Sequence, residues 1–348
     1  MFSNPKVLVT GSSGHLGKAL MLTLSDYGYT PIGIDIKPSP LTTHVGSIAD
    51  PAFVSNIFTT HHPDLSYVIH TATLHKPHIC SHTKSDFVST NVTGTLNLLE
   101  ASVSAHGGVK SFVFVSTTSA FGESLTTRPG MPAVWIDESV APKPKNIYGV
   151  TKIAAEEVCE LVNKEHGLPV VVLRTSRFFP EGDDDDQRRN SMGDDNLKVL
   201  ELGYRRVDVA DVVGACVRGL EKGPGLKGKW GKYIISAPTI FKKEEEVLKG
   251  LDKDAGGEYE KAVEGVREVF EGVGWRFLGR VDRVYDSRLA RRELGWEAVY
   301  TFERAVRMVE EGKEWRSELT GRVGKLGYHE ISMGVYTVRE VDSGDSGQ

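Results

Sequence analysis

Residues 6–20 read KVLVTGSSGHLGKAL, in which a short apolar run leads through three evenly spaced glycines into an amphipathic pattern. A strand, a glycine turn and a helix in this order direct backbone N–H groups and the positive end of the helix toward one point, which suits a pyrophosphate. Gly11 permits the tight turn, Gly14 lets the phosphate approach the backbone, and Gly17 lets the helix pack closely on the strand. We therefore predict a dinucleotide-binding turn here, in preference to a plain glycine-rich turn.

Short apolar runs rich in valine and isoleucine alternate with helical stretches over the first 175 residues. The runs are KVLVT, TPIGIDI, YVIHTA, SFVFVS and PVVVLR, and the helical stretches are 15–28, 50–62, 86–107 and 148–167. This alternation predicts an α/β fold with right-handed crossovers and a doubly wound parallel sheet of the Rossmann type. Gly28, Gly107 and Gly167 stand where helices are expected to end, because glycine adopts the left-handed conformation at low cost.

Charge and cysteine content argue against several classes of protein. The net charge is -5 and the isoelectric point is near 6.1, so we expect neither nucleic acid nor a membrane surface as a partner. No apolar run is as long as a membrane span, and residues 1–5 leave no room for a signal peptide, so we expect a cytoplasmic protein. The three cysteines are scattered, which indicates neither a disulfide framework nor a CxxC metal site.

An acidic residue ends the second apolar run, at the position that distinguishes nicotinamide cofactors. Asp35 lies eighteen residues past Gly17. A carboxylate at the end of the second strand accepts hydrogen bonds from the adenosine ribose and repels a 2′-phosphate. The placement predicts NAD in preference to a solvated turn acid, whereas the nearby Lys37 keeps NADP as a less favoured alternative.

A tyrosine and a lysine four residues apart follow the fifth strand of the predicted sheet. Tyr148 and Lys152 lie in NIYGVTKIAAEE, where a helix places both side chains on one face, one turn apart. An ammonium beside a phenol lowers the phenol pKa, so Tyr148 is expected to exchange a proton with a substrate hydroxyl near neutral pH. The hydroxyl cluster in FVFVSTTSAFG is expected to hold the substrate oxygen.

Taken together, these segments resemble the extended short-chain dehydrogenase/reductases, specifically the NAD-dependent epimerase/dehydratase group. The similar pieces are TGSSGHLG, IHTA, NVTGTLNLLEA, VSTTSAFG, YGVTK, VDVADVV and the C-terminal SRLARRELGW. The resemblance implies that Thr117 is the catalytic hydroxyl, with Ser116 the less favoured choice. It also implies that Tyr148 is the acid/base and that Lys152 lowers the pKa of Tyr148 and binds the nicotinamide ribose.

The resemblance further implies a set of cofactor contacts near the carboxyl ends of the strands. Ser47 replaces an aspartate that commonly lies near the adenine, so that contact is the weakest of the set. The expected contacts are Gly11, Gly14, His15, Leu16, Gly17, Asp35, Ile36, Ser47, Ile48, Thr71, Ala72, Thr73, Asn91, Ser116, Tyr148 and Lys152.

Departures from the family pattern bear on the substrate. Nucleotide-sugar epimerases usually carry an asparagine where this chain has Arg177, and the segment 177–211 is short for gripping a nucleotide diphosphate. Thr118 and Ser119 occupy the places where sugar dehydratases carry Asp and Glu, which disfavours water elimination. We therefore expect a compact sugar-like or polar substrate whose anionic end meets Arg177, since a guanidinium matches carboxylate or phosphate in two-point fashion. Arg205 and Arg206 are weaker candidates for the same role.

Six of the eleven histidines fall between His61 and His82. Metal ligation is possible for such a cluster, but the tyrosine–lysine pair needs no metal, so we expect none. His75 and Lys76, just beyond the fourth strand, are expected at the mouth of the substrate pocket, because ligands bind at the carboxyl ends of such strands. A plain loop is the competing interpretation.

The sequence thus predicts an NAD-dependent oxidoreductase that transfers hydride at a hydroxyl or carbonyl carbon of a small molecule. The alternatives are a nucleotide-sugar epimerase with tightly held NAD and a non-catalytic NAD(H) sensor. We expect residues 1–175 and 205–240 to form the NAD-binding domain, 176–204 and 241–335 to form the substrate-binding region, and 336–348 to be a disordered tail. A homodimer through the helices of 86–102 and 148–161 is expected from the resemblance, whereas burial in the core explains the apolar stripes of these helices equally well.

Overall fold

The computed structural model describes residues 4–104, 108–125, 127–180 and 191–324. At its centre is a seven-stranded parallel sheet in the order β10-β7-β5-β4-β1-β2-β3. Strand order reverses at β1, so the predicted doubly wound parallel sheet is confirmed. The strands are β1 (Lys6–Thr10), β2 (Thr30–Asp35), β3 (His44–Val45), β4 (Leu65–His70), β5 (Ser111–Thr117), β7 (Val170–Thr175) and β10 (Trp230–Ile235).

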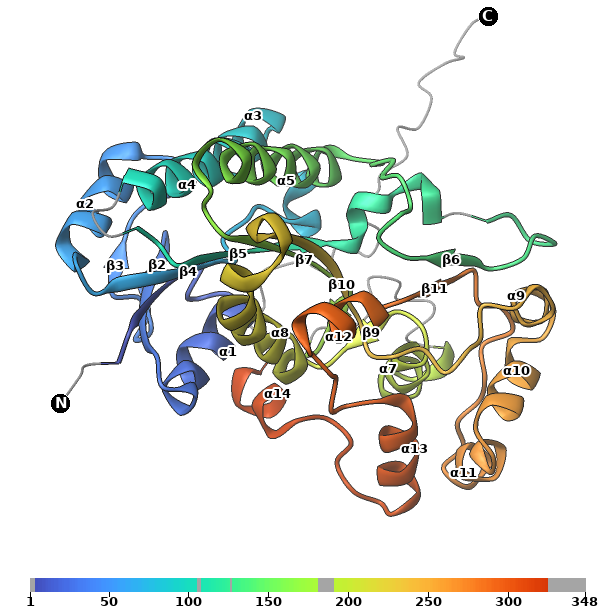
Figure 1. Ribbon diagram of the computed structural model, residues 1–348. Helices are drawn as coiled ribbons and strands as arrows, with labels where there is room; N and C mark the ends of the chain where they lie inside the picture. The colour runs from blue at the N-terminus through green and yellow to red at the C-terminus, as the bar shows by residue number, and fades with distance from the viewer. Residues whose placement is uncertain (1–3, 105–107, 126, 181–190, 325–348) are drawn as a thin grey trace, which may run out of the picture.

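Helices cover both faces of this sheet (Figure 1). One face carries α2 (Pro51–His61), α4 (Gly94–Ser104) and α5 (Ile147–His166), and the other carries α1 (His15–Thr23) and α8 (Val209–Lys222). Along β7, Val170 and Val172 pack toward the α5 face, whereas Val171 and Leu173 pack toward the α8 face. Burial on both faces explains why the central strands have continuous apolar runs instead of an alternating pattern.

A second apolar core joins the peripheral helices on the right of Figure 1. It is built from α7 (Asp194–Leu202), α9 (Glu245–Lys253), α10 (Ala255–Ala262), α11 (Val266–Gly272) and α13 (Phe302–Glu310). Two short parallel pairs accompany it: β6 (Val134–Ile136) with β11 (Arg283–Tyr285), and β8 (Arg177–Phe178) with β9 (Arg206–Val207).

Two C-terminal helices pack back on the central layers. Helix α12 (Arg288–Leu294) contacts β10 and α8, and α14 (Glu318–Val323) contacts α1 and α8. Part of the segment 241–335 therefore lies against the elements of the central sheet, and the division into two functional regions stays a prediction. The predicted tail 336–348 lies outside the described residues.

The helix expected over 86–107 is divided into three pieces: α3 (Lys84–Val88), a π-helical turn over Ser89–Thr93, and α4. The wide turn carries the buried Asn91, and single π-turns inside α-helices are frequent at functional sites. Gly28 and Gly167 end their helices with φ of 79° and 68°, as predicted, whereas Gly107 lies outside the described residues. Short 3-10 turns span Leu24–Tyr27, Lys76–Cys80, Thr118–Phe121, Glu123–Leu125, Gly223–Gly225 and Lys227–Lys229.

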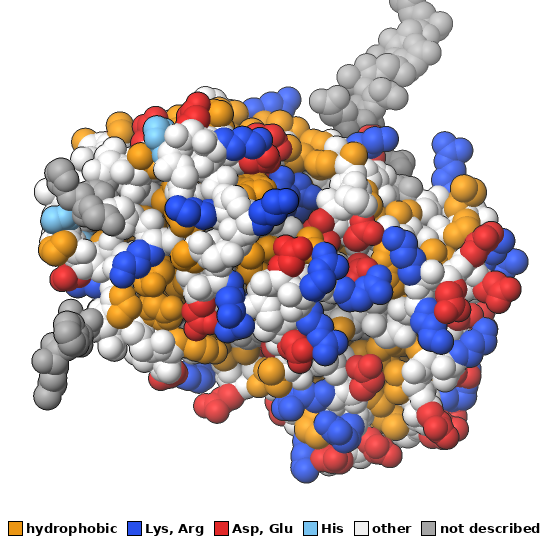
Figure 2. Space-filling view, in the orientation of Figure 1, with side chains coloured by type: hydrophobic (Ala, Val, Ile, Leu, Met, Phe, Trp, Pro, Cys, Tyr) orange, Lys and Arg blue, Asp and Glu red, His pale blue; other side chains and the backbone are white. Residues whose placement is uncertain are grey.

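Across the residues that the structure describes, none of the helices is both long enough and apolar enough to span a membrane. On the face shown in Figure 2, basic and acidic side chains intermingle, most densely where Figure 1 draws α9, α10, α11 and α13.

Candidate active site

The glycine turn between β1 and α1 is packed so closely that side chains do not fit. Gly11 has φ of 72°, and a Cβ there would lie 2.9 Å from the Ala72 backbone. A Cβ on Gly17 would lie 1.9 Å from the Gly11 carbonyl oxygen. Gly14 is the N-cap of α1 and has no side chain to cap the first amides of the helix. The residues present therefore fit a dinucleotide, because uncapped helical N–H groups are available to bind phosphate oxygens.

Asp35 stands beside this turn at the end of β2. One carboxylate oxygen accepts a hydrogen bond of 2.9 Å from the Ser13 backbone N–H, and the other accepts one of 2.9 Å from the Lys37 backbone N–H. Each oxygen retains a further lone pair for a ribose hydroxyl. Thr42 and Ser39 add hydroxyls that bond with Ser13 Oγ at 3.1 and 3.3 Å.

Thr10, at the end of β1, begins a chain of hydrogen bonds through His70. Thr10 Oγ1 accepts from the Thr71 and Ala72 backbone N–H groups, so its own proton is directed to His70 Nδ1 at 2.7 Å. His70 Nε2 then donates to Thr95 Oγ1 at 2.9 Å, and Thr95 donates to the Asn91 carbonyl oxygen at 2.7 Å. Burial, aided by the charge of Lys152, holds the pKa of His70 well below its usual range, which fits this neutral tautomer.

Asn91 joins the loop after β4 to α5. Its Oδ1 accepts from the Leu74 backbone N–H at 2.8 Å and from Thr73 Oγ1 at 3.0 Å. Its Nδ2 donates to the Leu74 carbonyl oxygen and to Thr151 Oγ1. These bonds fix the loop that follows β4 against α5.

The other expected cofactor residues lie around the same edge of the sheet. His15 and Leu16 are buried in the first turn of α1, and Ile48 is buried beside Gly94. Ile36, directly after Asp35, is 65% exposed, which leaves an apolar side chain open to a planar ring. Ser47 Oγ accepts from the Ala49 backbone N–H.

Thr117 and Tyr148 meet at the carboxyl end of β5. Thr117 is the last residue of that strand, and Tyr148 lies in the first turn of α5, whose N-cap is Asn146. Burial raises the pKa of Tyr148 to about 12, and a hydrogen bond with Thr117 acts in the opposite direction. The two hydroxyls are thus brought together, as the catalytic assignment requires.

Lys152 lies one helical turn after Tyr148 and is nearly inaccessible, with 2% exposure. Its Nζ donates to the Val115 carbonyl oxygen at 2.7 Å and lies 4.0 Å from the centre of the Phe114 ring. Burial lowers the pKa of Lys152 to about 7, opposed by the charge of Glu156. The expected lowering of the Tyr148 pKa by this lysine is not seen in this structure, where burial raises that pKa.

Ser116, expected to contact the cofactor, directs its hydroxyl elsewhere. Adjacent residues of a strand point to opposite faces, and Ser116 Oγ donates to Glu156 Oε1 at 2.5 Å. Glu156 also forms a two-point ion pair with Arg174 of β7. Sequence reasoning missed this buried network, although the spacing of four residues between Lys152 and Glu156 was a usable signal.

The expected substrate residues lie on two segments beside the pair. Leu74 and Ile79 pack against Tyr148, and His75 and Lys76 lie in the segment between them. Their role in substrate binding stays a prediction. Arg177 begins β8, two residues after Thr175, which is paired with Thr117 across the sheet.

The weaker arginine candidates are engaged within the protein. Arg205 Nε donates to Glu201 Oε1 at 2.9 Å, and Arg206 Nε donates to Glu201 Oε2 at 2.7 Å. Arg206 and Glu201 are both fully buried. This pairing favours a structural role for both arginines, because both already donate hydrogen bonds to the Glu201 carboxylate.

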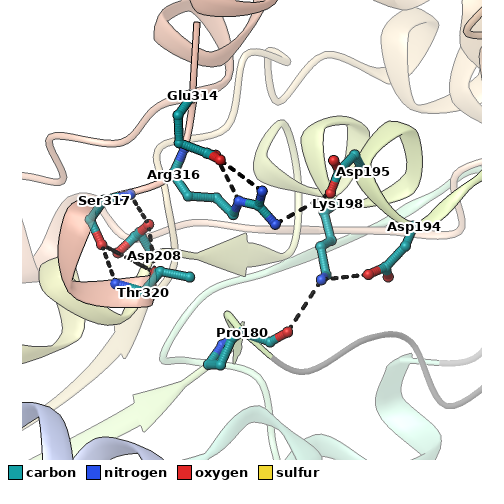
Figure 3. A network of polar contacts seen from close by, with 9 residues as sticks. All are labelled: Pro180, Asp194, Asp195, Lys198, Asp208, Glu314, Arg316, Ser317 and Thr320. Atoms are coloured by element: carbon teal, nitrogen blue, oxygen red, sulfur yellow. Dashed lines mark hydrogen bonds and ion pairs between the residues drawn. The ribbon is translucent and has the colours of Figure 1, made fainter. Parts of the chain in front are cut away.

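A polar network tethers the segment after β8 to the C-terminal helix (Figure 3). Lys198 of α7 binds Asp194 at 2.7 Å and the Pro180 carbonyl oxygen at 3.3 Å. Arg316 reaches Asp195 at 3.5 Å, and beside it the buried Asp208 accepts from Ser317 Oγ at 2.6 Å. Through Lys198, the network fixes the backbone at Pro180 against α7.

The histidine-rich segment forms edge-to-face ring pairs. The His75 and His78 rings are 4.4 Å apart between centres, and the His78 and His82 rings are 5.2 Å apart. Across the residues that the structure describes, no three histidine, cysteine or acidic side chains are grouped as metal ligands.

Residues 7–227 match the family described as "NAD dependent epimerase/dehydratase family". A UDP-glucose 4-epimerase of Halalkalibacterium halodurans is 32% identical over 340 residues, covering 90% of this chain and 96% of the relative.

Solved structures share the fold. The UDP-glucose 4-epimerase of Thermotoga maritima, determined with UDP-glucose, superposes with a TM-score of 0.60 at 24% identity, covering 88% of this chain and 97% of its own. A short-chain dehydrogenase/reductase superfamily protein of Agrobacterium tumefaciens with bound NAD gives a TM-score of 0.59 at 22% identity, covering 88% of this chain and 96% of its own.

Proposed function

The chain belongs to the NAD-dependent epimerase/dehydratase family, and from that premise we propose that it transfers hydride at a hydroxyl- or carbonyl-bearing carbon of a sugar substrate. The observation that carries the proposal is the placement of Tyr148, in the first turn of α5, beside Thr117 at the end of β5, with Lys152 one turn further along α5. NAD, when bound, supplies the hydride acceptor. Tyr148 as phenolate takes the hydroxyl proton, Thr117 orients the substrate oxygen, and the Lys152 ammonium stabilises the phenolate.

NAD is the proposed cofactor in preference to NADP, and Asp35 is the group that distinguishes them. Its carboxylate beside the glycine turn is suited to a ribose diol and repels a 2′-phosphate. Gly11, Gly14 and Gly17 would admit the pyrophosphate, and Lys152 would bind the nicotinamide ribose.

The proposed substrate is a UDP-linked hexose. Similarity to a UDP-glucose 4-epimerase runs over 96% of that relative's length, which supports a substrate of the same class. A compact sugar or sugar acid is the second candidate, favoured by Arg177 at the start of β8. In the epimerase case the hydride returns to the opposite face of the same carbon, whereas a dehydrogenase releases the reduced cofactor.

The test begins with the protein as purified. We expect the ultraviolet and mass spectra of the released ligand to identify NAD, and incubation with UDP-glucose to yield UDP-galactose without net cofactor reduction. Net formation of NADH with an unlinked sugar would support the second candidate. Failure to turn over any sugar, with NAD bound, would instead support a sensor without catalysis.

A homodimer is the proposed assembly, with α4 and α5 at the interface. Val150 and Leu161 on α5 are 47% and 52% exposed. They are eleven residues apart, close to three helical turns, so they lie on one stripe of the helix. Exposed apolar side chains aligned in this way favour burial against a second helix.

A further inference from the structure

Three side chains lie in register along α5. Tyr148, Lys152 and Glu156 are spaced by four residues, which places them on one face at successive turns. Glu156 is fully buried, with 0% exposure. A buried carboxylate is costly unless it is paired and hydrogen-bonded, so its surroundings must compensate for its charge.

Groups from three strands hold the Glu156 carboxylate. Arg174 of β7 donates from Nε to Oε1 at 3.0 Å and from its terminal nitrogen to Oε2 at 2.6 Å. Lys232 of β10 lies 3.2 Å from Oε2, and Ser116 of β5 donates to Oε1 at 2.5 Å. The carboxylate is thus fixed in place between the sheet and the helix that carries Tyr148.

Lys152 depends on its neighbours for charge balance. Its Nζ contacts a backbone carbonyl oxygen and the face of Phe114, which orient an ammonium but carry no full negative charge. The ionisable groups around Lys152 and Glu156 are Tyr148 and Cys159 on α5, His70 on β4, Arg174 on β7 and Lys232 on β10. At neutral pH, Glu156 is the anion of that set.

We propose that Glu156 is a positioning residue for the Tyr148–Lys152 pair, whose fixed buried carboxylate keeps Lys152 protonated for proton exchange at Tyr148. The role in proton exchange at Tyr148 rests on the proposed function. The effect of Glu156 on the protonation of Lys152 does not depend on it. The titration behaviour agrees with this role. Burial lowers the pKa of Lys152 to about 7, and Glu156 makes the largest opposing contribution. Burial also opposes the ionisation of Glu156, but Arg174, Lys232 and Ser116 together hold its pKa below the usual range.

The test compares two variants that change the same network in opposite directions. Glu156→Gln keeps the size of the side chain and removes the charge, so the midpoint of Lys152 should fall by about one pH unit or more. Lys232→Met removes a competing cation from a partly exposed position, so the same midpoint should rise. Carbon-13 NMR of ε-labelled lysine follows the Lys152 titration directly, with the signal assigned from Lys152→Arg.

A purely structural network predicts a different pattern: both variants lose stability and the Lys152 midpoint stays in place, which would overturn the proposal. If Glu156→Gln fails to fold, Lys232→Met decides by itself, and an unchanged or lowered midpoint counts against the inference. In the pH–rate profiles of the parent protein and the two variants, the apparent pKa assigned to Lys152 should shift in the same direction as its NMR midpoint. The NMR titration of Lys152 needs no substrate. A protein that turns over no substrate would therefore refute the proposed function, while the titration would still test this inference.

Discussion

The Asp35 carboxylate accepts a hydrogen bond of 2.9 Å from the backbone N–H of Ser13, so the end of β2 braces the glycine turn between β1 and α1. The second carboxylate oxygen holds the Lys37 backbone N–H in the same way. Asp35 therefore has a structural task besides any contact with the cofactor, and experiments on it must separate the two.

Replacement of Asp35 tests cofactor choice. Asp35→Ala should weaken NADH binding by about 2 kcal/mol, the order expected for loss of a charged hydrogen bond. NADPH should be weakened much less, because repulsion of the 2′-phosphate disappears with the carboxylate. Fluorescence titration with both cofactors measures the difference. Asp35→Asn keeps an oxygen acceptor for the Ser13 amide and serves as the matched control; equal loss for both cofactors in the alanine variant would mean that the acid only braces the turn.

Tyr148→Phe tests the catalytic assignment. The change removes one oxygen, so turnover should fall by about 10²–10⁴-fold, the range of general acid–base catalysis, while NADH affinity stays within about twofold. Thr117→Val should lower turnover less, because it removes the orienting hydroxyl and leaves the proton-exchanging group. Steady-state rates together with cofactor titration separate the two effects. A Tyr148→Phe enzyme with full activity would exclude this tyrosine as the acid/base.

The depressed pKa of Lys152 predicts a stability that depends on pH. Burial lowers the pKa of Lys152 to about 7, so with rising pH the folded protein releases this proton before the unfolded chain does, and the stabilising contribution is full above 10.5 and is lost as pH falls toward 7. Lys152→Met should therefore flatten the rise of stability with pH by about 1.4 kcal/mol per unit in that interval. Urea unfolding at several pH values measures the slope, and parallel curves for the variant and the parent protein would contradict the assignment.

Thermal shift in the presence of NAD tests the substrate class. A ligand at one hundred times its dissociation constant should add about 2.7 kcal/mol of stability. We expect UDP, UDP-glucose and UDP-galactose to stabilise the protein, and unlinked sugars and sugar acids to have little effect. Stabilisation by sugar acids alone, lost in Arg177→Ala, would favour the compact substrate instead.

Light scattering after gel filtration tests the dimer. The double variant Val150→Glu/Leu161→Glu places two charges on the exposed stripe of α5 and should halve the measured mass. Val273→Glu alters an exposed apolar side chain at the end of α11 and serves as the control, with no change expected. A double variant of unchanged mass would place the interface elsewhere.

Local features carried most of what the sequence determined by itself. The glycine turn, the runs that became β1, β2, β4, β5 and β7, and the Tyr148–Lys152 spacing all depend on neighbours within a few residues. Hydrogen-bonding rules and side-chain periodicity act over that range, so they can be recognised without the fold. The place of Asp35 could also be predicted. It is the last residue of β2, and the carboxyl ends of parallel strands lie at the same edge of the sheet, here beside the glycine turn.

Tertiary structure decided where those side chains point and what balances their charge. Ser116 faces Glu156 because the pairing of β5 with β7 sets the face of each strand residue, and Lys232 reaches the same carboxylate from β10, 76 residues further along the chain than Glu156. The sequence makes Arg205 and Arg206 weak candidates for binding an anionic substrate, and only the fold pairs both of them with Glu201. The energy of a buried charge depends on every partner that folding brings within a few ångströms, and no local pattern contains that information.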